Sequence, residues 1–341
     1  MDNNRKKVSV LIPCRNEAQS IENCIKNVYD FEPPEGGFEV IIIDGMSDDE
    51  TRDILCRLKK EYNSLSIIDN SRLTVPHAMN LGIQQAQGEY IIRTDVRCIH
   101  PKTYLKDLIK LSEKTGADNV GGVLIPIGET YTQKSIAAAY KSPVALGGAL
   151  RDRGDFVGET DAVYGGCFRR ERLLDVGMYD ETMVRNQDDE LSFRLRKSGG
   201  KVLQSGNIRV KYFPRRHFKQ LFKQFLQYGY WKVSVLKKHP AQASWRHYAP
   251  AMLVSGFSGM LLATLFNIHL LPVLLLYTGG YLLSVSAESL RLTYKKRDIE
   301  LWPGVVTAIV VIHTGFGLGF IAGIVSRLLG LKPQYFESLS R

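Results

Sequence analysis

Two short apolar runs near the start of the chain each end in a group of polar residues. The first covers residues 8–12 and is followed by Pro13, Asn16 and Glu17; the second covers residues 40–43 and is followed by Asp44. Runs that are rich in β-branched residues and do not alternate with polar ones are typical of parallel strands buried on both faces. Residues 18–30, between the runs, have apolar side chains at helical spacing, so the segment predicts a β-α-β unit.

The same alternation continues along the next part of the chain. It predicts an α/β fold with a doubly wound, mostly parallel sheet. Further strands are expected at 66–69, 90–92, 120–127 and 201–213, and further helices at 48–60, 75–87, 101–115 and 190–198. Residues 133–160 have a weak pattern interrupted by glycines and are expected to form a substrate-facing loop region.

The polar groups after the first two runs mark the expected binding site, because ligands of open α/β sheets bind at the carboxyl ends of the strands. Neither group contains the glycine-rich loop of a dinucleotide site or the lysine loop of a P-loop enzyme. Carboxylate and amide side chains stand there instead. The pattern therefore indicates a nucleotide that is recognised through its base and sugar.

Two long tracts in the second half of the chain contain no Asp, Glu, Lys or Arg. They are the 41 residues 247–287 and the 26 residues 301–326, and the first has a natural break at 267–272. A membrane-spanning helix needs roughly 20 apolar residues, so about three hydrophobic helices are expected. A buried core domain is the alternative, but such long uncharged runs are rare in soluble folds.

The net charge of +10 is concentrated directly before these tracts. Residues 201–250 contain eleven of the 45 Lys and Arg residues and none of the 35 acidic ones, so the rest of the chain is nearly neutral. Basic segments beside membrane tracts lie on the cytoplasmic side, and the short basic loop 291–297 follows the same rule. Three crossings would place the basic tail 327–341 outside, so a re-entrant or monotopic hairpin stays open.

Residues 217–238 form the central part of the basic segment and predict an amphipathic helix. Phenylalanine and leucine recur at helical spacing, and lysines alternate with them. Such a helix can lie in the lipid headgroup layer; a helix packed on the protein is the alternative, and both can hold. A nucleic-acid partner is not expected, because the basic stripe leads straight into uncharged residues. The five cysteines are odd in number and form no Cys-x-x-Cys pair, which favours a reducing cytosol.

Several of these motifs together resemble glycosyltransferase family 2, whose members have the GT-A fold. The resemblance covers about residues 8–235 and is closest to membrane-bound exopolysaccharide enzymes of the succinoglycan glucosyltransferase type. Together with the basic segment and the uncharged tracts, it predicts a catalytic domain at 1–213, a basic interfacial segment at 214–246, a membrane region at 247–329 and a tail at 330–341. The motifs are the Pro-x-x-Asn-Glu turn at 13–17, Asp44-Gly45, Asn80-x-Gly82 followed by 88–92, and 165–171 followed by 188–191.

The resemblance implies that the polar residues after the runs 8–12 and 40–43 form the donor site. Pro13, Asn16 and Glu17 are expected to line the nucleoside pocket of a UDP-sugar. Asp44 is expected to accept the imide N–H of the uracil base. The alternative for Asp44 is an aspartate that caps a turn before glycine, which is a common arrangement.

Asp95 corresponds to the first acid of the family's Asp-x-Asp motif, which usually holds Mg²⁺ or Mn²⁺ at the donor diphosphate. The third position of the motif is Arg97, so one of the usual carboxylates is missing. A divalent cation can still bind through Asp95, substrate phosphates and water. Alternatively, Arg97 or Arg93 neutralises the diphosphate, since arginine pairs well with phosphate.

Asp188 lies where the family has its general base, directly before the helix expected at 190–198. Asp189 is the rival assignment, because Gln187 replaces the usual preceding acid. The structural alternative for Asp188 and Asp189 is that they only stabilise the N-terminus of the helix through its dipole. Gln224 matches an acceptor-side motif of cellulose-synthase-like relatives, and Tyr228 and Trp231 are further candidates for contact with the acceptor or the membrane interface. The Arg and Trp of that motif are absent, which favours single sugar addition over polymerisation.

These features together predict an inverting glycosyltransferase of cell-surface polysaccharide synthesis. It would be anchored in the inner membrane with its catalytic domain in the cytosol. The expected donor is UDP-glucose and the expected acceptor is a hydroxyl of a polyprenyl-diphosphate-linked saccharide. Two alternatives stay open: transfer to a polyprenyl monophosphate, which needs no general base, and a non-catalytic subunit that senses nucleotide sugars.

Overall fold

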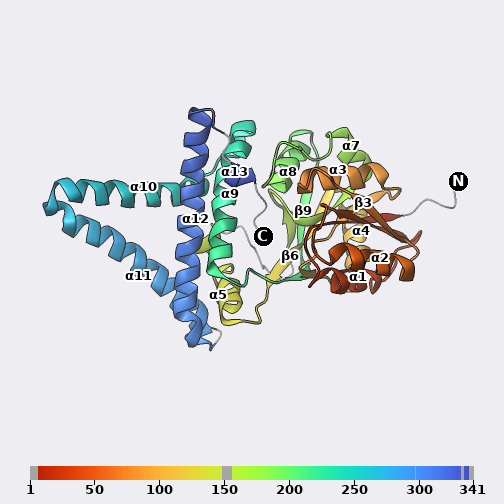
Figure 1. Ribbon diagram of the computed structural model, residues 1–341, viewed down its shortest axis with the longest axis horizontal. Coiled ribbons are helices and arrows are strands. Elements are labelled where there is room, and N and C mark those ends of the chain that lie inside the picture. The colour runs from red at the N-terminus through yellow and green to blue at the C-terminus, as the bar shows by residue number, and fades with distance from the viewer. Residues whose placement is uncertain (1–6, 148–155, 296, 332–333, 338–341) are drawn as a thin grey trace. The chain divides into compact units, whose positions relative to one another are not determined.

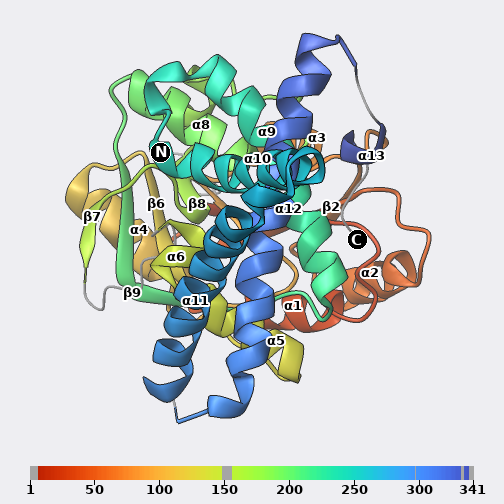
Figure 2. The ribbon, with the colours of Figure 1, turned by 90° about the vertical axis from the view of Figure 1, so that its left-hand side faces the viewer.

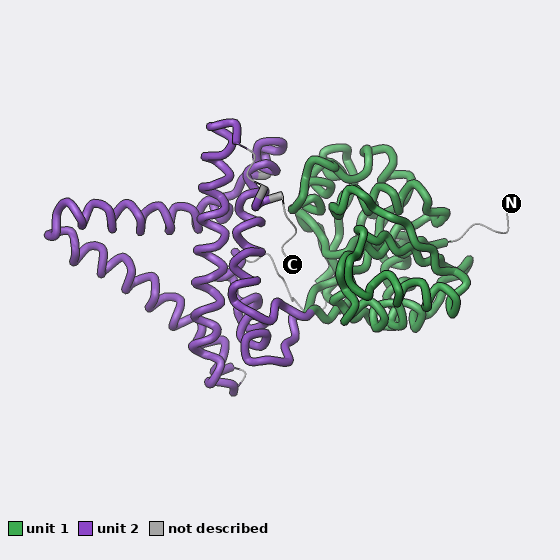
Figure 3. Tube along the Cα trace, in the orientation of Figure 1, with its two compact units in different colours: residues 1–125, 152–212 green, residues 126–151, 213–341 purple. Residues whose placement is uncertain are grey.

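A computed structural model of the chain, seen from two directions in Figure 1 and Figure 2, describes residues 7–147, 156–295, 297–331 and 334–337. The chain forms two compact units, coloured separately in Figure 3. The first contains residues 1–125 and 152–212, and the second contains residues 126–151 and 213–341. Each unit has a hydrophobic core of its own.

A nine-stranded sheet is the centre of the first unit, so the predicted α/β fold is confirmed. The sheet is mixed and not mostly parallel as predicted, because the strands after β4 join it through antiparallel pairs. Four parallel strands come first, in the order β3-β2-β1-β4. Beyond β4 the strands run antiparallel: β8 to both β4 and β6, and β5 and β7 to β9. The parallel strands are β1 (Val8–Cys14), β2 (Phe38–Asp44), β3 (Leu65–Asp69) and β4 (Tyr90–Arg93); the others are β5 (Cys98–Ile99), β6 (Asn119–Pro126), β7 (Val157–Glu159), β8 (Tyr164–Arg169) and β9 (Val202–Tyr212).

Both faces of the parallel strands are buried, which explains their unalternating sequences. In β1, Val10 and Ile12 face a core that includes Ile25 of α1, whereas Leu11 faces the opposite core with Ile83 of α3. Helices therefore cover the sheet on both sides, as a doubly wound fold requires. They are α1 (Ile21–Tyr29), α2 (Thr51–Glu61), α3 (Val75–Gln85), α4 (Tyr104–Thr115), α7 (Arg170–Asp175) and α8 (Gln187–Lys197).

The second unit is helical in its described parts. Three segments are long and apolar enough to cross a membrane, namely Trp245–Phe266, Ile268–Lys295 and Ile299–Leu328, so the expected hydrophobic helices are confirmed. The other helices include the expected amphipathic one, which extends over 21 residues as α9. The helices are α5 (Tyr131–Ala139), α6 (Pro143–Leu146), α9 (Phe218–Lys238), α10 (Trp245–Phe266), α11 (Leu271–Lys295), α12 (Trp302–Leu328) and α13 (Gln334–Glu337), with short 3₁₀ helices at Pro240–Gln242, Ile268–Leu270 and Ile299–Leu301.

The prediction of a loop region at 133–160 is wrong over its first part. Residues there form α5, which begins with a capping box in which Thr130 and Gln133 bond each other's backbone. The small residues Ala137–Ala139 then pack in the second unit, where they are buried. Residues 148–155 of the expected loop lie outside the described part of the chain.

Candidate functional site

The carboxyl ends of β1 and β2 carry two loops that are hydrogen-bonded to each other. Cys14 and Asp44, the last residues of the two strands, are paired in register. The backbone N–H of Asn16 donates to Ser47 Oγ at 2.9 Å. The Asn16 side chain makes two bonds to Asp48: its Nδ2 donates to Asp48 Oδ1 at 2.6 Å, and its Oδ1 accepts the Asp48 backbone N–H at 3.0 Å. Asn16 has a positive φ of 53°, a conformation that asparagine tolerates better than most residues. The two polar groups of the sequence therefore meet at one edge of the sheet.

Asp44 is almost completely buried, with 2% of its surface exposed. Its carboxylate accepts the Ser47 hydroxyl at 2.6 Å and lies 3.4 Å from Nη1 of Arg52. The same Nη1 donates to Asp69 at 2.5 Å, at the end of β3. Asp44 thus has the turn-capping arrangement, within a small charged network; its contact with a base stays a prediction.

Arg93, the last residue of β4, connects two of the predicted site residues. Its Nη1 lies 2.6 and 2.9 Å from the two carboxylate oxygens of Asp188, and its Nε and Nη2 lie 3.1 and 3.0 Å from Oδ1 of Asp95. The Arg93 side chain is 10% exposed, whereas those of Asp95 and Asp188 are 36% and 40% exposed. A buried guanidinium therefore holds two solvent-accessible carboxylates side by side.

Asp188 lies in the first turn of α8, together with Asp189 and Glu190. Although part of its side chain stays exposed, the surrounding protein removes water from the Asp188 carboxyl group and so raises its pKa, and the nearby charges of Asp95 and Asp189 act in the same direction. The Arg93 guanidinium opposes them and favours the ionised carboxylate. A carboxylate with a raised pKa that can still ionise is suited to accept a proton near neutral pH.

A second contact fixes the loop that leads into α8. The side chain of Asn80, on α3, donates to the carbonyl of Tyr179 and accepts the Tyr179 N–H, both at 2.9 Å. Its Nδ2 also lies 2.9 Å from Oε1 of Glu181, whose other oxygen lies 3.0 Å from Nε2 of His77. The Asn80-x-Gly82 motif therefore has a structural role, because it anchors the segment before Asp188.

Arg97 and Glu17, both predicted to be donor-site residues, contact each other. Nε of Arg97 lies 3.1 Å from Oε2 of Glu17. The backbone N–H of Glu17 is held by the hydroxyl of Thr51, at 2.8 Å, at the start of α2. The contact brings the loop after β4 to the loop after β1, so the ends of three parallel strands contribute to one site.

Asp95 can hold a divalent cation, but with little help from other protein acids. Among the described residues there is no group of three or more His, Cys, Asp or Glu side chains that could hold a metal. Both hydrogen bonds from Arg93 fall on Oδ1 of Asp95, so Oδ2 is the oxygen that could bind a cation. Mg²⁺ commonly binds through one or two carboxylates, substrate phosphates and water, and the residues fit a cation that arrives with a diphosphate.

The other candidates lie on α9, in the second unit. Nε2 of Gln224 donates to Tyr228 Oη at 3.0 Å, and Arg215 Nε donates to Gln224 Oε1 at 3.2 Å. Trp231 is 9% exposed and donates through Nε1 to the backbone carbonyl of Phe336 at 3.0 Å. At Trp231 the helix has the packed arrangement that was the alternative to lipid contact.

The sequence pointed to Arg93 only as a partner of the diphosphate and to Asn80 only as part of a family motif, and it indicated no role for Arg52. One signal for Arg93 is present in the sequence. An arginine that ends a buried strand needs carboxylate partners, because an unpaired buried charge is strongly unfavourable. The partner Asp188 lies 95 positions away, however, and nothing in a single sequence identifies it.

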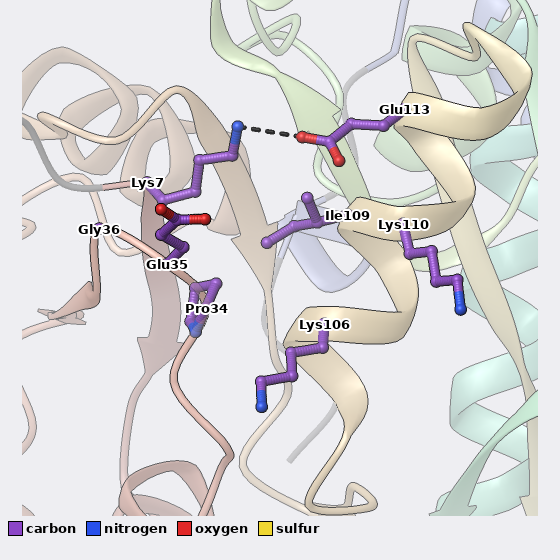
Figure 4. Close-up of a pocket in the computed structure, with 8 residues that line it drawn as sticks. All are labelled: Lys7, Pro34, Glu35, Gly36, Lys106, Ile109, Lys110 and Glu113. Atoms are coloured by element: carbon purple, nitrogen blue, oxygen red, sulfur yellow. Dashed lines mark ion pairs between the residues drawn. The ribbon is translucent and has the colours of Figure 1, made fainter.

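A hollow elsewhere on the first unit has no relation to these residues (Figure 4). It is lined by Lys7, which precedes β1, and by the α4 residues Lys106, Lys110 and Glu113. It therefore lies at the amino end of β1, whereas the site lies at the carboxyl ends. Its charges are mixed, and Lys7 pairs with Glu113 at 3.0 Å.

Comparison with known proteins supports one interpretation of this site. The family model for Glycosyl transferase family 2 matches residues 9–177. The chain is 29% identical over 313 residues to the succinoglycan biosynthesis protein ExoA of Rhizobium meliloti (strain 1021), covering 91% of this chain and 93% of that protein. It is 25% identical over 325 residues to a dolichyl N-acetyl-alpha-D-glucosaminyl phosphate 3-beta-D-2,3-diacetamido-2,3-dideoxy-beta-D-glucuronosyltransferase of Methanococcus voltae, covering 93% and 97% of the two chains.

A solved structure has the same fold. The mannosyltransferase PcManGT from Pyrobaculum calidifontis, in complex with GDP-Man and Mn²⁺, matches with a TM-score of 0.60 and 19% identity. The match covers 96% of this chain and 88% of that one. This similarity confirms the GT-A fold that the sequence motifs implied.

Proposed function

Because the chain belongs to glycosyltransferase family 2, and to its exopolysaccharide branch, we propose that it transfers glucose from UDP-glucose to a hydroxyl of a polyprenyl-diphosphate-linked saccharide. As a glycosyltransferase it acts in the synthesis of a polysaccharide or a lipid-linked glycan. The relative from Methanococcus voltae, whose name describes transfer to a dolichyl-linked sugar, supports an acceptor of this kind.

The observation that carries the proposal is the position of Arg93 between Asp95 and Asp188. Asp188 takes the proton from the acceptor hydroxyl while the hydroxyl oxygen attacks the anomeric carbon of the donor. The bond from that carbon to the diphosphate breaks, and UDP leaves with the electron pair. Attack from the face opposite UDP inverts the anomeric configuration. Arg93 holds the base in its ionised form and orients it beside the residue that faces the diphosphate.

The donor is held by the loops after the three parallel strands. Pro13, Asn16 and Glu17 line the nucleoside, Asp44 accepts the base N–H, and Arg97 adds a positive charge near the diphosphate. Mg²⁺ or Mn²⁺ would bind at Asp95 and would neutralise the diphosphate oxygens as they take up charge. The Mn²⁺ in the structure of PcManGT supports a divalent cation here as well.

The three apolar helices support attachment to the inner membrane, with the catalytic unit in the cytosol where UDP-sugars are made. The acceptor is then a lipid-linked saccharide in the same membrane, and membrane lipids contact the second unit.

The proposal is tested by transfer of radiolabel from UDP-glucose into the lipid-extractable fraction of membranes that contain the protein. We expect label with the wild type, loss of label with Asp188→Asn, and retained label with Asp189→Asn. Loss in Asp189→Asn alone would move the base to that residue. Label that survives both substitutions would indicate a phosphate acceptor, which is already ionised and needs no base. No label with any variant, while UDP still binds, would favour a nucleotide-sensing subunit.

A further inference from the structure

Helices α9 and α12 of the second unit lie side by side through glycine contacts (Figure 1). Gly315, Gly319 and Gly323 recur at every fourth position of α12 and face the α9 backbone. A Cβ on Gly315 would lie 3.0 Å from the carbonyl oxygen of Phe222, and one on Gly323 would lie 2.8 Å from that of Tyr230. Small residues at this spacing let two helix backbones approach closely. Since 315 faces 222 and 323 faces 230, the helices run parallel.

This register places lysines of α9 at the level of the middle of α12. Continuing it, Lys219 is level with residue 312 and Lys223 with residue 316, near the centre of Trp302–Leu328. Lys219 is exposed. If α12 crossed a bilayer, both ammonium groups would lie near its midplane, where a lysine side chain is strongly unfavourable. The close pairing of α9 with α12 therefore disfavours a membrane-spanning α12.

Segments outside the three apolar helices also cover α12 along its length. Near its start, the Gly304 N–H donates to Tyr131 Oη of α5 at 3.1 Å. Near its middle, Nε2 of His313 lies 3.0 Å from the carbonyl oxygen of Val144 in α6. In the most apolar stretch of α12, half of the residues are buried inside the protein. In the corresponding stretches of the other two apolar helices, 11% are buried. Much of the apolar surface of α12 is thus already covered by protein.

Helices α10 and α11 differ from α12 in this respect. They leave α12 at an angle and meet at the far end of a hairpin, as Figure 1 and Figure 2 show. Near the tip, Leu265 is 76% exposed, Phe266 86% and Leu276 77%. The hairpin extends about 22 Å from Ala251, which packs against Phe320 of α12, to Phe266. No Asp, Glu, Lys or Arg occurs between His247 and Ala287 to keep this surface in water.

We propose that α10 and α11 alone insert into the bilayer, as a hairpin that returns to the face it left, and that α12 lies with α9 along that face. Lipid acyl chains cover the hairpin, and the lysines of α9 meet the anionic headgroups. The arrangement places both ends of α12 on the same side of the membrane. It also accounts for the basic residues after α12, which three crossings would place outside.

The test is cysteine labelling of the full chain in sealed membrane vesicles with a membrane-impermeant maleimide. Cys56 is exposed and reports the side of the first unit, while the other four cysteines are buried. In a Cys56→Ser background, Ile299→Cys and Leu329→Cys place one thiol at each end of α12, at positions that are 53% and 65% exposed. We expect both to react from the side on which Cys56 reacts in the wild type. Reaction of the two from opposite sides would overturn the proposal.

Two further measurements test whether the tip of the hairpin contacts lipid and on which side of the membrane the two ends of the wild-type chain lie. A bimane attached to Phe266→Cys should be quenched by phospholipids that carry bromine on their acyl chains. Absence of quenching would mean that another protein chain, such as a second copy, covers the tip, and would overturn the proposal. Should the cysteine variants fail to fold, reporters fused to either end of the wild-type chain give the answer. They are expected on the same side, and opposite sides would exclude an even number of crossings.

Discussion

Nη1 of Arg93 contacts both carboxylate oxygens of Asp188, at 2.6 and 2.9 Å, and the rest of the same guanidinium contacts Asp95. One buried cation thus serves a proposed base and a proposed metal ligand. Because its planar group has a fixed geometry, it sets the direction of each carboxylate as well as its charge. Lysine could supply the charge but not the two-sided contact.

The activity should therefore have an acid limb that Arg93 controls. Asp188 must be ionised to act as base, so kcat/KM falls as the pH drops through its pKa, which burial raises above the ordinary aspartate value. Loss of the guanidinium removes the opposing influence, and the pKa rises further. In Arg93→Gln we expect the acid limb of the kcat/KM profile to move up by about 1 pH unit or more.

Two variants separate this effect from a loss of structure. Arg93→Lys keeps the charge, so its acid limb should stay near that of the wild type while kcat falls. Arg97→Gln removes a cation that contacts Glu17 and not Asp188, and should leave the acid limb in place. An acid limb that moves equally in Arg93→Gln and Arg97→Gln would contradict the assignment of Asp188.

Asp44 and Asp69 form a matched pair for the donor site, because both contact Nη1 of Arg52 and only Asp44 is proposed to accept the base N–H. Asp44→Asn should weaken UDP binding by about 10- to 100-fold, the range for a lost hydrogen bond to a charged group. Asp69→Asn should change it much less. Calorimetric titration with UDP measures both, and equal losses would mean that Asp44 acts only through the Arg52 network.

Removal of divalent cations should abolish transfer, and Mn²⁺ or Mg²⁺ should restore it. Asp95→Asn should raise the Mn²⁺ concentration needed for half-maximal binding in the presence of UDP by at least about tenfold, since even outer-shell partners of metal ligands are worth 10- to 100-fold. Electron paramagnetic resonance of bound Mn²⁺ gives the measurement without requiring turnover. Asp188→Asn is the control, and a loss of Mn²⁺ binding there but not in Asp95→Asn would reassign the ligand.

The glycine contacts between α9 and α12 predict a stability difference between two similar substitutions. Gly319→Ala places a methyl group against the Leu226 carbonyl and should destabilise the second unit by about 1 to 3 kcal/mol, as overpacking does. Gly279→Ala on α11 meets nothing within 4 Å and should leave stability unchanged or slightly raised. Thermal unfolding in detergent compares the two, and an equal Tm would show that the helices separate easily.

The first unit was predictable as far as local patterns determine it. Residues 8–12 and 40–43 are unalternating because both faces of these strands are covered, and the structure extends them to Val8–Cys14 and Phe38–Asp44. The antiparallel part of the sheet was harder to predict from the sequence. Short strands such as Cys98–Ile99 have no period of their own and exist only through pairing with Val202–Tyr212.

The site shows the same limit. Asp44, Asp95 and Asp188 stand at ends of strands and a helix, where sequence motifs locate them. The bridge by Arg93 depends on a contact across 95 positions, and the anchoring of Tyr179 by Asn80 on one across 99. The helix α5 was missed although the pair Thr130 and Gln133 has the spacing of a capping box. That signal is local and was available.

The reciprocal bonds between Asn16 and Asp48 have a consequence for how the donor is captured. They tie together the loops after β1 and β2 through bonds that the protein makes to itself. A nucleotide entering there meets side chains whose freedom is already restricted, so little conformational entropy remains to be lost on binding. Loss of the Asn16–Asp48 bonds would leave the reacting side chains in place. The two loops would then be ordered only when the nucleotide binds.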